Sequence, residues 1–416
     1  MGDRPVPVAL EGGRIGSLDF IRGIAVMGIL AANIVAFGQP FGAYVWPGAF
    51  LTPHDGASDW LWAAQLVLVD GKMRGLFTLL FGAGLYLFME KAWAKGATRW
   101  LQARRLFWLL LFGAAHYFLV WRGDILMIYA CAGFIAILCL RWSAKTQMIV
   151  GVTGYLLGAL AYLGMFGTPY LVAETSFGDR PEFADMKAEL AEGKAEALVD
   201  DAAEVEILTQ GSYADFVAHN VSAHGGEPLF NIVLFGFETL PLILIGMALY
   251  RWGMFDGRIV RRKQLVWGIA GLVVGFMLTI PIALWAKENG LTYWGTIGAM
   301  LSFTHLPRLP VVIGLAAILA VIGGQASGWL AERISAAGRA AFSNYLGTSM
   351  AMMLVFHPWA GGLFGVLDRP HLYLVVILAW VAMLAWSKPW LDHFRYGPLE
   401  WLWRCLTYGR RFAFRR

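Results

Sequence analysis

The chain contains 416 residues, of which 58% are hydrophobic and 15% are charged, whereas a soluble domain usually carries about 25% charged residues. This composition excludes a water-soluble enzyme, a disordered chain and a nucleic-acid-binding domain. We therefore interpret the formal net charge of +5 as a record of which loops face the cytoplasm, and we expect no nucleic-acid partner.

Ten apolar runs are candidates for crossing the hydrocarbon core of a bilayer, which is roughly 30 Å thick and needs about 20 helical residues. In chain order they cover residues 20–38, 74–90, 106–121, 125–140, 147–166, 228–250, 264–286, 308–324, 340–356 and 371–387. The pattern predicts an all-α fold, a polytopic helical membrane protein with about ten transmembrane helices in a lipid bilayer. A shorter apolar stretch, 291–303, is a candidate re-entrant segment.

Basic residues are concentrated in every second connection between these runs. Cytoplasmic loops of membrane proteins carry the excess of Lys and Arg, so the alternation predicts that both termini are cytoplasmic. The residues concerned are Arg4, Arg14 and Arg22; Lys91, Lys95, Arg99, Arg104 and Arg105; Arg141 and Lys145; Arg251, Arg258, Arg261, Arg262 and Lys263; Arg333 and Arg339; and those from Lys388 to Arg416.

One extracytoplasmic connection, residues 167–226, is strongly acidic. It holds twelve acidic and three basic residues, a balance of −9, so the rest of the chain carries +14. Its middle part, 183–208, predicts one or two amphipathic helices, either as a solvated connector or as a lid over an outward-facing site. It divides the chain into a five-span half (1–166), the acidic loop (167–226) and a second five-span half with a cytoplasmic tail (227–416).

Polar side chains in the first span are candidates for function, because charges and amides at membrane depth are costly unless they are paired or hydrated. Asp19 and Arg22 lie three residues apart at the cytoplasmic start of the span and can pair on one helix face. Asn33 follows about 16 Å further along the same helix. A helix cap with an ion pair, and helix packing for Asn33, are the structural alternatives to ligand binding.

Histidines and charged residues gather on the predicted outer side. The third and fourth spans form a helical hairpin with His116, Arg122 and Asp124 near its tip, which is more than a helix cap requires. The other outer-side candidates are His54, Lys72 and Arg74 between the first two spans, and His305 and Arg308 before the eighth. Besides Asp19 and Glu238 the spans hold almost no acidic residues, which argues against an ion-coupled pump.

The predicted cytoplasmic side carries a different set of groups. Arg104, Arg105 and Arg339 are joined there by Ser343 and Asn344, which open the ninth span. Guanidinium groups suit the phosphates of an anionic ligand. Small hydroxyl residues serve either close helix packing or hydrogen bonding to such a ligand.

Several motifs resemble the YeiB family of bacterial inner-membrane proteins, which carry the domain of unknown function 418. The resemblance covers essentially the whole chain and implies an inner-membrane location. It leaves the oligomeric state open, and a homodimer is one of the options. The motifs are the run from Arg14 to Gly23 with Asn33, the segment Gly71–Gly84, the pair Arg104–Arg105 followed by His116 and Asp124, the segment Gly338–Tyr345, and the tail Gly397–Thr407.

The family is distantly similar to heparan-α-glucosaminide N-acetyltransferase, which passes an acetyl group from cytosolic acetyl-CoA to an amino sugar across a membrane. Asp19, Arg22 and Asn33 match its Asp-x-x-Arg-Gly helix and the Asn that follows. His54 is then the counterpart of its outer-side catalytic His, but the spacing of 21 residues from Asn33 is longer here. His116 therefore remains the alternative.

The resemblance implies a transmembrane acyltransferase that moves an acyl group, expected to be acetyl, from cytoplasmic acyl-CoA to an amine or hydroxyl of an extracytoplasmic or membrane-embedded acceptor. A sugar or a lipid-linked molecule would fit as acceptor, and no metal is expected. A small-molecule transporter or exporter and a non-catalytic assembly protein are the alternatives. We predict catalytic roles for His54, His116, Asn33 and Asp124; acyl-CoA binding by Asp19, Arg22, Arg104, Arg105, Arg339, Ser343 and Asn344; and acceptor binding by Lys72, Arg74, Arg122, His305 and Arg308.

The chemistry of these side chains fits acyl transfer. A His near its free pKa of about 6.5 can take the proton of the attacking amine or hydroxyl. An amide such as that of Asn33 can donate to the developing oxyanion.

Overall fold

The computed structural model describes residues 15–416, which form helices and turns, with one isolated bridge between Phe394 and Arg415 in this range. A helix occupies each of the ten predicted spans. These helices are α1 (Gly16–Gly38), α3 (Lys72–Trp93), α4 (Arg99–Leu119), α5 (Leu126–Ala136) continued by η3 (Ile137–Arg141), α6 (Ala144–Tyr162), α10 (Glu227–Arg251), α11 (Arg261–Glu288), α13 (His305–Gly323), α15 (Ala341–Phe356) and α16 (Arg369–His393). Arg4 and Arg14 of the predicted charge pattern lie outside the described residues.

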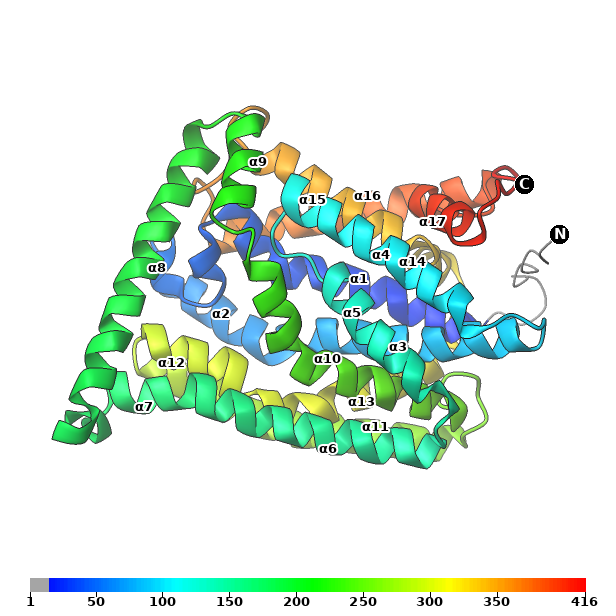
Figure 1. Ribbon diagram of the computed structural model, residues 1–416, viewed down its shortest axis with the longest axis horizontal. Coiled ribbons are helices and arrows are strands. Elements are labelled where there is room, and N and C mark those ends of the chain that lie inside the picture. The colour runs from blue at the N-terminus through cyan, green and yellow to red at the C-terminus, as the bar shows by residue number, and fades with distance from the viewer. Residues whose placement is uncertain (1–14) are drawn as a thin grey trace.

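Among the described residues, six helices are long and apolar enough to cross a membrane: α1, α6 with its continuation to Glu174, α10, α11, α13 and α16. The apolar helices at Leu126–Arg141 and at α15 are shorter, while α3 contains Arg74 and Glu90 and α4 contains Arg104 and Arg105. All four run within the same bundle as the six (Figure 1). The structure thus confirms an all-helical, multi-pass membrane fold.

The two ends of the bundle differ in charge. The helices α8 (Ala184–Gln210) and α9 (Tyr213–Ser222) lie at one end, where α8 crosses the direction of the bundle (Figure 1). The C-terminus, α17 (Pro398–Tyr408) and the basic connections from α3 to α4 and from α10 to α11 lie at the other end (Figure 1). The acidic helix predicted at 183–208 therefore forms, and it lies far from the basic connections.

Glycine lets the central helices approach at backbone distance. A Cβ atom on Gly338 of α14 (Trp329–Arg339) would lie 1.8 Å from the Asp19 carbonyl oxygen of α1. A Cβ on Gly246 of α10 would likewise lie 2.1 Å from the Leu79 carbonyl oxygen of α3. Such contacts are typical of membrane helices, whose interfaces favour small residues. They place α1, α3 and α10 at the centre of the bundle.

The stretch 291–303 becomes a helical lead into α13 instead of a separate span. It contains α12 (Tyr293–Ile297) and a π-helical turn, η7 (Gly298–Phe303), which contacts a second π-helical turn, η4 (Leu163–Gly167), at the end of α6. Isolated π-turns are frequent at functional sites. The remaining elements are η1 (Phe41–Tyr44), η2 (Pro47–Ala49), α2 (Ala57–Leu68), α7 (Thr168–Glu174), η5 (Ser176–Asp179) and η6 (Pro181–Phe183).

Candidate functional site

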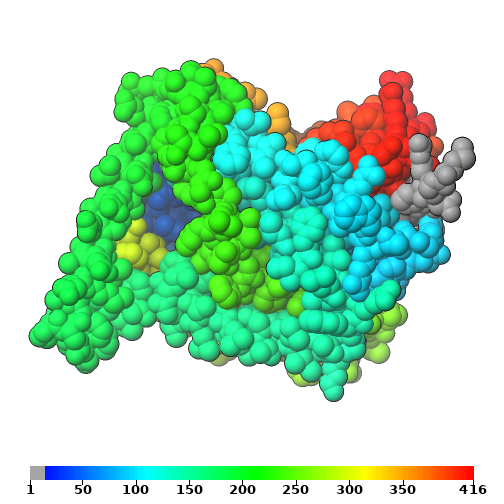
Figure 2. Space-filling view, viewed as in Figure 1, coloured from blue at the N-terminus to red at the C-terminus, as the bar shows by residue number. Residues whose placement is uncertain are grey.

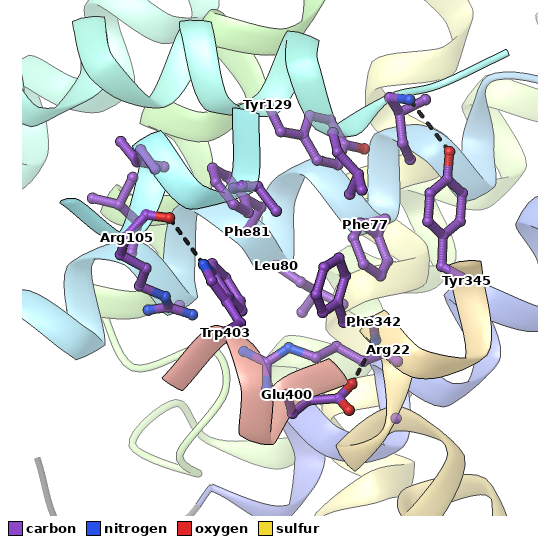
Figure 3. A pocket seen from close by; sticks show the side chains of 18 of the residues that line it. Arg22, Phe77, Leu80, Phe81, Arg105, Tyr129, Phe342, Tyr345, Glu400 and Trp403 are labelled. Atoms are coloured by element: carbon purple, nitrogen blue, oxygen red, sulfur yellow. Dashed lines mark hydrogen bonds between the residues drawn. The ribbon is translucent and has the colours of Figure 1, made fainter. Parts of the chain in front are cut away.

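A central cavity of about 210 Å³ is lined by residues of α1, α3, α4, α5, α14, α15 and α17. Complete ligand pockets usually measure roughly 300–1,000 Å³, so this cavity accommodates only part of a large ligand. Its polar and aromatic residues form two groups, with Arg22, Arg105, Glu400 and Trp403 toward one end and Tyr129 and Tyr345 toward the other (Figure 3). The walls between them are apolar and include Phe77, Leu80, Phe81, Leu85, Leu106, Leu109, Leu126 and Phe342.

Three of the four predicted acyl-CoA arginines meet at the first end of the cavity. Arg22, Arg105 and Arg339 all contribute to its lining. The Arg105 guanidinium lies 4.3 Å from the ring centroid of Trp403, a cation–π contact that fixes its position. Arg22 forms the predicted pair with Asp19, with Nη1 3.3 Å from Oδ1, and keeps 28% of its side-chain exposure. This end therefore presents guanidinium groups to an incoming anion.

Arg104, the fourth predicted arginine, lies elsewhere. Its guanidinium is next to Gly409, just beyond the end of α17, and it is not among the residues that line the cavity. From α4, the neighbouring Arg105 points in a different direction, toward Trp403. Only one member of the Arg104–Arg105 pair is thus in a position to bind a ligand in the cavity.

Ser343 and Asn344 are held by protein groups. Ser343 Oγ donates to Glu400 Oε2 at 2.5 Å, while Glu400 Oε1 accepts the N–H groups of Phe342 (2.7 Å) and Ser343 (3.0 Å). Glu400 therefore caps the first turn of α15 and fastens α17 to it. Burial raises the pKa of Glu400 above its usual value. Asn344 Nδ2 donates to Ala337 O at 3.0 Å and to Ser387 Oγ at 3.1 Å, so neither predicted residue is free to bind acyl-CoA.

Beside the second end of the cavity lies a buried His–Asp pair. His116 Nδ1 is 2.8 Å from Asp124 Oδ2, and the two side chains are 1% and 0% exposed. Asp124 Oδ1 also accepts the Met127 N–H at 2.9 Å, so the predicted helix cap forms as well. A carboxylate acceptor keeps the proton on Nδ1. His116 Nε2 has no hydrogen-bond partner among residues 15–416, and its lone pair is available to take a proton.

Tyr345 joins this pair to the cavity and to Asn33. Its ring centroid lies 5.2 Å from that of His116, and its hydroxyl accepts the Ile125 N–H at 3.3 Å, as Figure 3 shows. Tyr345 lines the central cavity and also a small neighbouring pocket that contains Asn33 and Trp121. The structure therefore brings two predicted catalytic residues, His116 and Asn33, close to one tyrosine.

His54, the counterpart implied by the family resemblance, has both ring nitrogens engaged. Nδ1 is 3.0 Å from Asp59 Oδ1 of α2, and Nε2 accepts from Arg369 Nε of α16 at 2.8 Å. Burial, together with the adjacent Arg369 charge, lowers the pKa of His54 to about 4. Its geometry is that of a link between α2 and α16, which leaves no nitrogen for a substrate.

Two of the predicted acceptor-binding residues form a buried ion cluster. Arg74 Nη2 lies 2.5 Å and Arg308 Nη1 lies 3.1 Å from the same oxygen, Glu238 Oε2. We call Arg74, Glu238 and Arg308 the outer arginine cluster, after the outer side on which the sequence predicted Arg74 and Arg308. Arg74 keeps 25% of its side-chain exposure, whereas Glu238 and Arg308 keep 3% each. The cluster is therefore reached through Arg74.

His305 and Lys72 lie near this cluster in different settings. The His305 ring stacks on Tyr155 at 4.2 Å between centroids and meets Tyr162 edge-on at 4.7 Å. Neither of its ring nitrogens has a hydrogen-bond partner among the described residues. Lys72 is fully buried and donates to the Leu66 carbonyl at 2.5 Å. His305 thus remains available to a ligand, while Lys72 serves the turn between α2 and α3.

Arg122 is a structural anchor for the segment that contains α8. Its guanidinium lies 2.9 Å from Glu204 Oε2 of α8 and 3.7 Å from Glu227 Oε1 of α10. It also packs 4.1 Å from the ring centroid of Phe41. Arg122 therefore ties the hairpin tip to α8 and α10. Its guanidinium, which was predicted to bind the acceptor, is paired with protein carboxylates instead.

Tyr129 connects the cavity with the outer arginine cluster. Its ring lines the cavity, while its hydroxyl lies 2.9 Å from Thr78 Oγ1 and donates to the Arg74 carbonyl at 3.3 Å. One aromatic side chain and one turn of α3 thus separate the two sites. No functional role was predicted for Tyr129 or Tyr345, because an aromatic residue in an apolar helix is most often part of the core.

A bundle of membrane-length helices around a cavity with a basic end defines this molecule as a polytopic helical membrane protein with an internal cavity. Residues 249–410 match a family model described as a protein of unknown function, DUF418. The chain is 33% identical over 407 residues to the uncharacterized protein YeiB of Escherichia coli (strain K12), an alignment that covers 94% of this chain and 95% of YeiB.

Two further relatives match over nearly their whole length. The uncharacterized protein YxaH of Bacillus subtilis (strain 168) is 31% identical over 405 residues, which cover 95% of this chain and 94% of YxaH. An uncharacterized 39.9 kDa protein from the amylase 3′ region of Bacillus acidopullulyticus is 24% identical and covers 98% of this chain and 97% of its own. The chain belongs to the YeiB family, as its motifs predicted. No solved structure matches it.

Proposed function

We propose that this protein is a transmembrane acyltransferase that moves an acyl group, most simply acetyl, from cytoplasmic acyl-CoA to an amine or hydroxyl of an acceptor on the outer side. The observation that carries the proposal is the placement of the His116–Asp124 pair. A base with a free nitrogen lies beside one end of an apolar cavity, and three arginines stand at the other end. This order, from phosphate binding through an apolar channel to a base, is what transfer from acyl-CoA requires.

In this proposal all ten helices of the predicted spans cross the bacterial inner membrane, and both termini are cytoplasmic. The basic connections and the arginine end of the cavity then face the cytoplasm. Arg22, Arg105 and Arg339 bind the phosphates of acyl-CoA by charge-assisted hydrogen bonds. The acyl-pantetheine arm lies between the apolar walls, and the thioester reaches the Tyr129 and Tyr345 end.

The residues there can carry out the transfer. His116 Nε2 takes the proton of the acceptor amine or hydroxyl, whose nitrogen or oxygen forms a bond to the thioester carbon. Asp124 stabilises the imidazolium that results. Tyr345 and Asn33 supply hydrogen-bond donors to the carbonyl oxygen as it becomes negative. The carbon–sulfur bond then breaks, and the CoA sulfur receives the proton from His116.

The test is acetyl-CoA turnover by purified protein, measured as transfer or hydrolysis. His116→Gln should lower the turnover number about 10²–10⁴-fold, the usual contribution of a general base. His54→Gln is the matched control and should stay within about twofold, since its amide can replace both hydrogen bonds of His54. Full activity in a folded His116→Gln protein would refute this assignment.

A small-molecule transporter is the second candidate, favoured by one observation. The outer arginine cluster places a carboxylate and two guanidinium groups inside the bundle, and ionisable residues at that depth often mark a transport pathway. Proton- or sodium-dependent uptake into proteoliposomes, without acetyl-CoA turnover, would favour this alternative over the enzyme.

A further inference from the structure

The outer arginine cluster has more hydrogen-bonding capacity than its protein partners use. Glu238 Oε2 accepts from both guanidinium groups, while Glu238 Oε1 is buried and has no partner among residues 15–416. Arg308 Nε and both ring nitrogens of His305 are also buried without a partner in this part of the chain. A buried polar group that is left unpaired destabilises the fold, and more so if it is charged. The cluster is thus poorly explained by packing alone.

The charge of the cluster indicates the kind of ligand. Two guanidinium groups share one carboxylate, and the nearby buried Lys72 and Asp70 add one charge of each sign. One positive charge therefore remains in a site where Glu238 and Arg308 are only 3% exposed. An uncompensated charge in such a setting is strongly destabilising. An anion that reaches the partly exposed Arg74 would compensate it, and a hydroxyl or ammonium group on the same ligand could donate to Glu238 Oε1.

The surroundings of Arg74 show from where a ligand can arrive. Its guanidinium lies 4.4 Å from the ring centroid of Phe235 on α10, and Tyr44 of η1 and Tyr162 of α6 are within electrostatic range. Figure 2 shows a recess between α8 and α10, with atoms of the early, blue part of the chain and of the yellow α12 region at its floor. The elements around Arg74 therefore border a recess at the α8 end of the molecule.

We propose that this recess and the outer arginine cluster bind an anion that also carries a hydroxyl or ammonium group. A phosphate ester has this chemistry, whether it is soluble or part of a lipid headgroup. The anionic group binds Arg74, and the ligand O–H or N–H donates to Glu238 Oε1. The ligand is the acyl acceptor, an identification that rests on the proposed function, whereas anion binding itself does not. Tyr129 lines the central cavity and donates to the main-chain carbonyl of Arg74, so the residue that binds this anion adjoins the cavity wall.

The experiment measures the binding of radiolabelled glycerol 3-phosphate to the full chain in phosphatidylcholine nanodiscs. Saturable binding is expected, and Arg74→Gln should weaken it more than tenfold. Should that variant fail to fold, Arg74→Lys keeps the ion pair but lacks the planar fork of arginine and should weaken binding about tenfold. The control is Arg180→Gln, on the same side of the molecule with its side chain 58% exposed, which should leave the affinity unchanged.

Further arms identify the source of the anion and separate this inference from the proposed function. Phosphatidylglycerol in the nanodisc should lower the apparent affinity for glycerol 3-phosphate if the ligand is a lipid, and leave it unchanged if the ligand is soluble. Absence of saturable binding, or equal affinities for wild type and a folded Arg74→Gln protein, would overturn the inference. Coenzyme A binding in the same nanodiscs should be equal in both proteins. If the wild type did not bind coenzyme A, the proposed acyl-CoA site would be refuted, and the anion site would be unaffected.

Discussion

Two His–Asp pairs with a buried histidine share their local geometry and differ in their surroundings. His116 Nδ1 lies 2.8 Å from Asp124, and His54 Nδ1 lies 3.0 Å from Asp59. Arg369 donates to Nε2 of His54, whereas Nε2 of His116 has no partner among the described residues. The difference between a base and a structural link thus lies in the second ring nitrogen, and not in the carboxylate contact that both histidines make.

The carboxylates of the two pairs differ as well. Asp124 is fully buried and Asp59 is 28% exposed. A buried carboxylate stabilises an adjacent imidazolium more strongly than a solvated one, because less water screens the charges. Asp124 therefore suits a transition state in which His116 becomes positive, while the Asp59 contact mainly orients a histidine that stays neutral.

The largest effect should come from removing the charge of Asp124. In Asp124→Asn the amide can still cap α5, but it can donate to Nδ1 and move the proton of His116 to Nε2. The base would then be lost with little change in shape, and we expect the turnover of acetyl-CoA to fall about 10²–10⁴-fold. The measurement is the turnover number at saturating acetyl-CoA.

Asp59→Asn is the matched control for this prediction. The same chemical change in the His54 pair should leave the turnover number within about twofold, because His54 takes no part in proton transfer. If Asp59→Asn reduced activity as much as Asp124→Asn, the distinction between the two pairs would be wrong. Thermal unfolding of both variants would show whether a loss of fold explains the result.

What the sequence predicted well is what short stretches of chain determine. The ten apolar runs became helices, since apolar length is a local property, and α8 formed where the Ala- and Glu-rich pattern indicated it. The His116–Asp124 pair was also predictable. Its members are eight residues apart in a hairpin, and so short a connection brings their side chains close together.

The remaining contacts depend on residues far apart in the chain. Arg369, which occupies His54, is 315 residues away, and Glu238 meets Arg74 across 164 residues. No local pattern predicts these pairings. The Ser343 hydroxyl suited ligand binding, but it donates a hydrogen bond to Glu400 of the C-terminal helix α17 instead. The sequence thus indicated which polar groups were unusual, and the tertiary contacts decided which of them remain available.

Acid should destabilise the His54 link. The pKa of His54 is about 4 in the folded protein, below its ordinary value of about 6.5. Folding therefore favours the neutral ring, and below about pH 6.5 the unfolded chain binds the additional proton, so stability is lost as the pH falls from about 6.5 to 4. The difference between the two pKa values corresponds to about 3 kcal/mol.

His54→Gln isolates this contribution, because an amide at position 54 does not titrate. The free energy of unfolding of wild type and variant is measured in the same detergent between about pH 7.5 and 4, a range set by the two pKa values of about 4 and 6.5. The wild type should lose about 3 kcal/mol more of this free energy than the variant. Equal losses would mean that His54 accepts a proton in the folded state. Its ring would then be available for chemistry, and the two His–Asp pairs would no longer differ as described.

The smallest effect is expected at the arginine end of the cavity, far from His116 and with a different kinetic signature. Arg105→Gln should raise the KM for acetyl-CoA about tenfold and leave the turnover number unchanged, because a phosphate contact is the same in the ground state and the transition state. Raising the salt concentration should increase the KM of the wild type more than that of the variant.

Arg251→Gln provides the control for Arg105. Arg251 also stacks on an aromatic ring, that of Tyr86 at 4.8 Å, but it is not among the residues lining the cavity. Its substitution should change neither constant. A fall in turnover number at unchanged KM in Arg105→Gln would place Arg105 at the chemical step. The separation of a binding end from a His116 end within one cavity would then fail, and with it the reason for preferring His116 over His54.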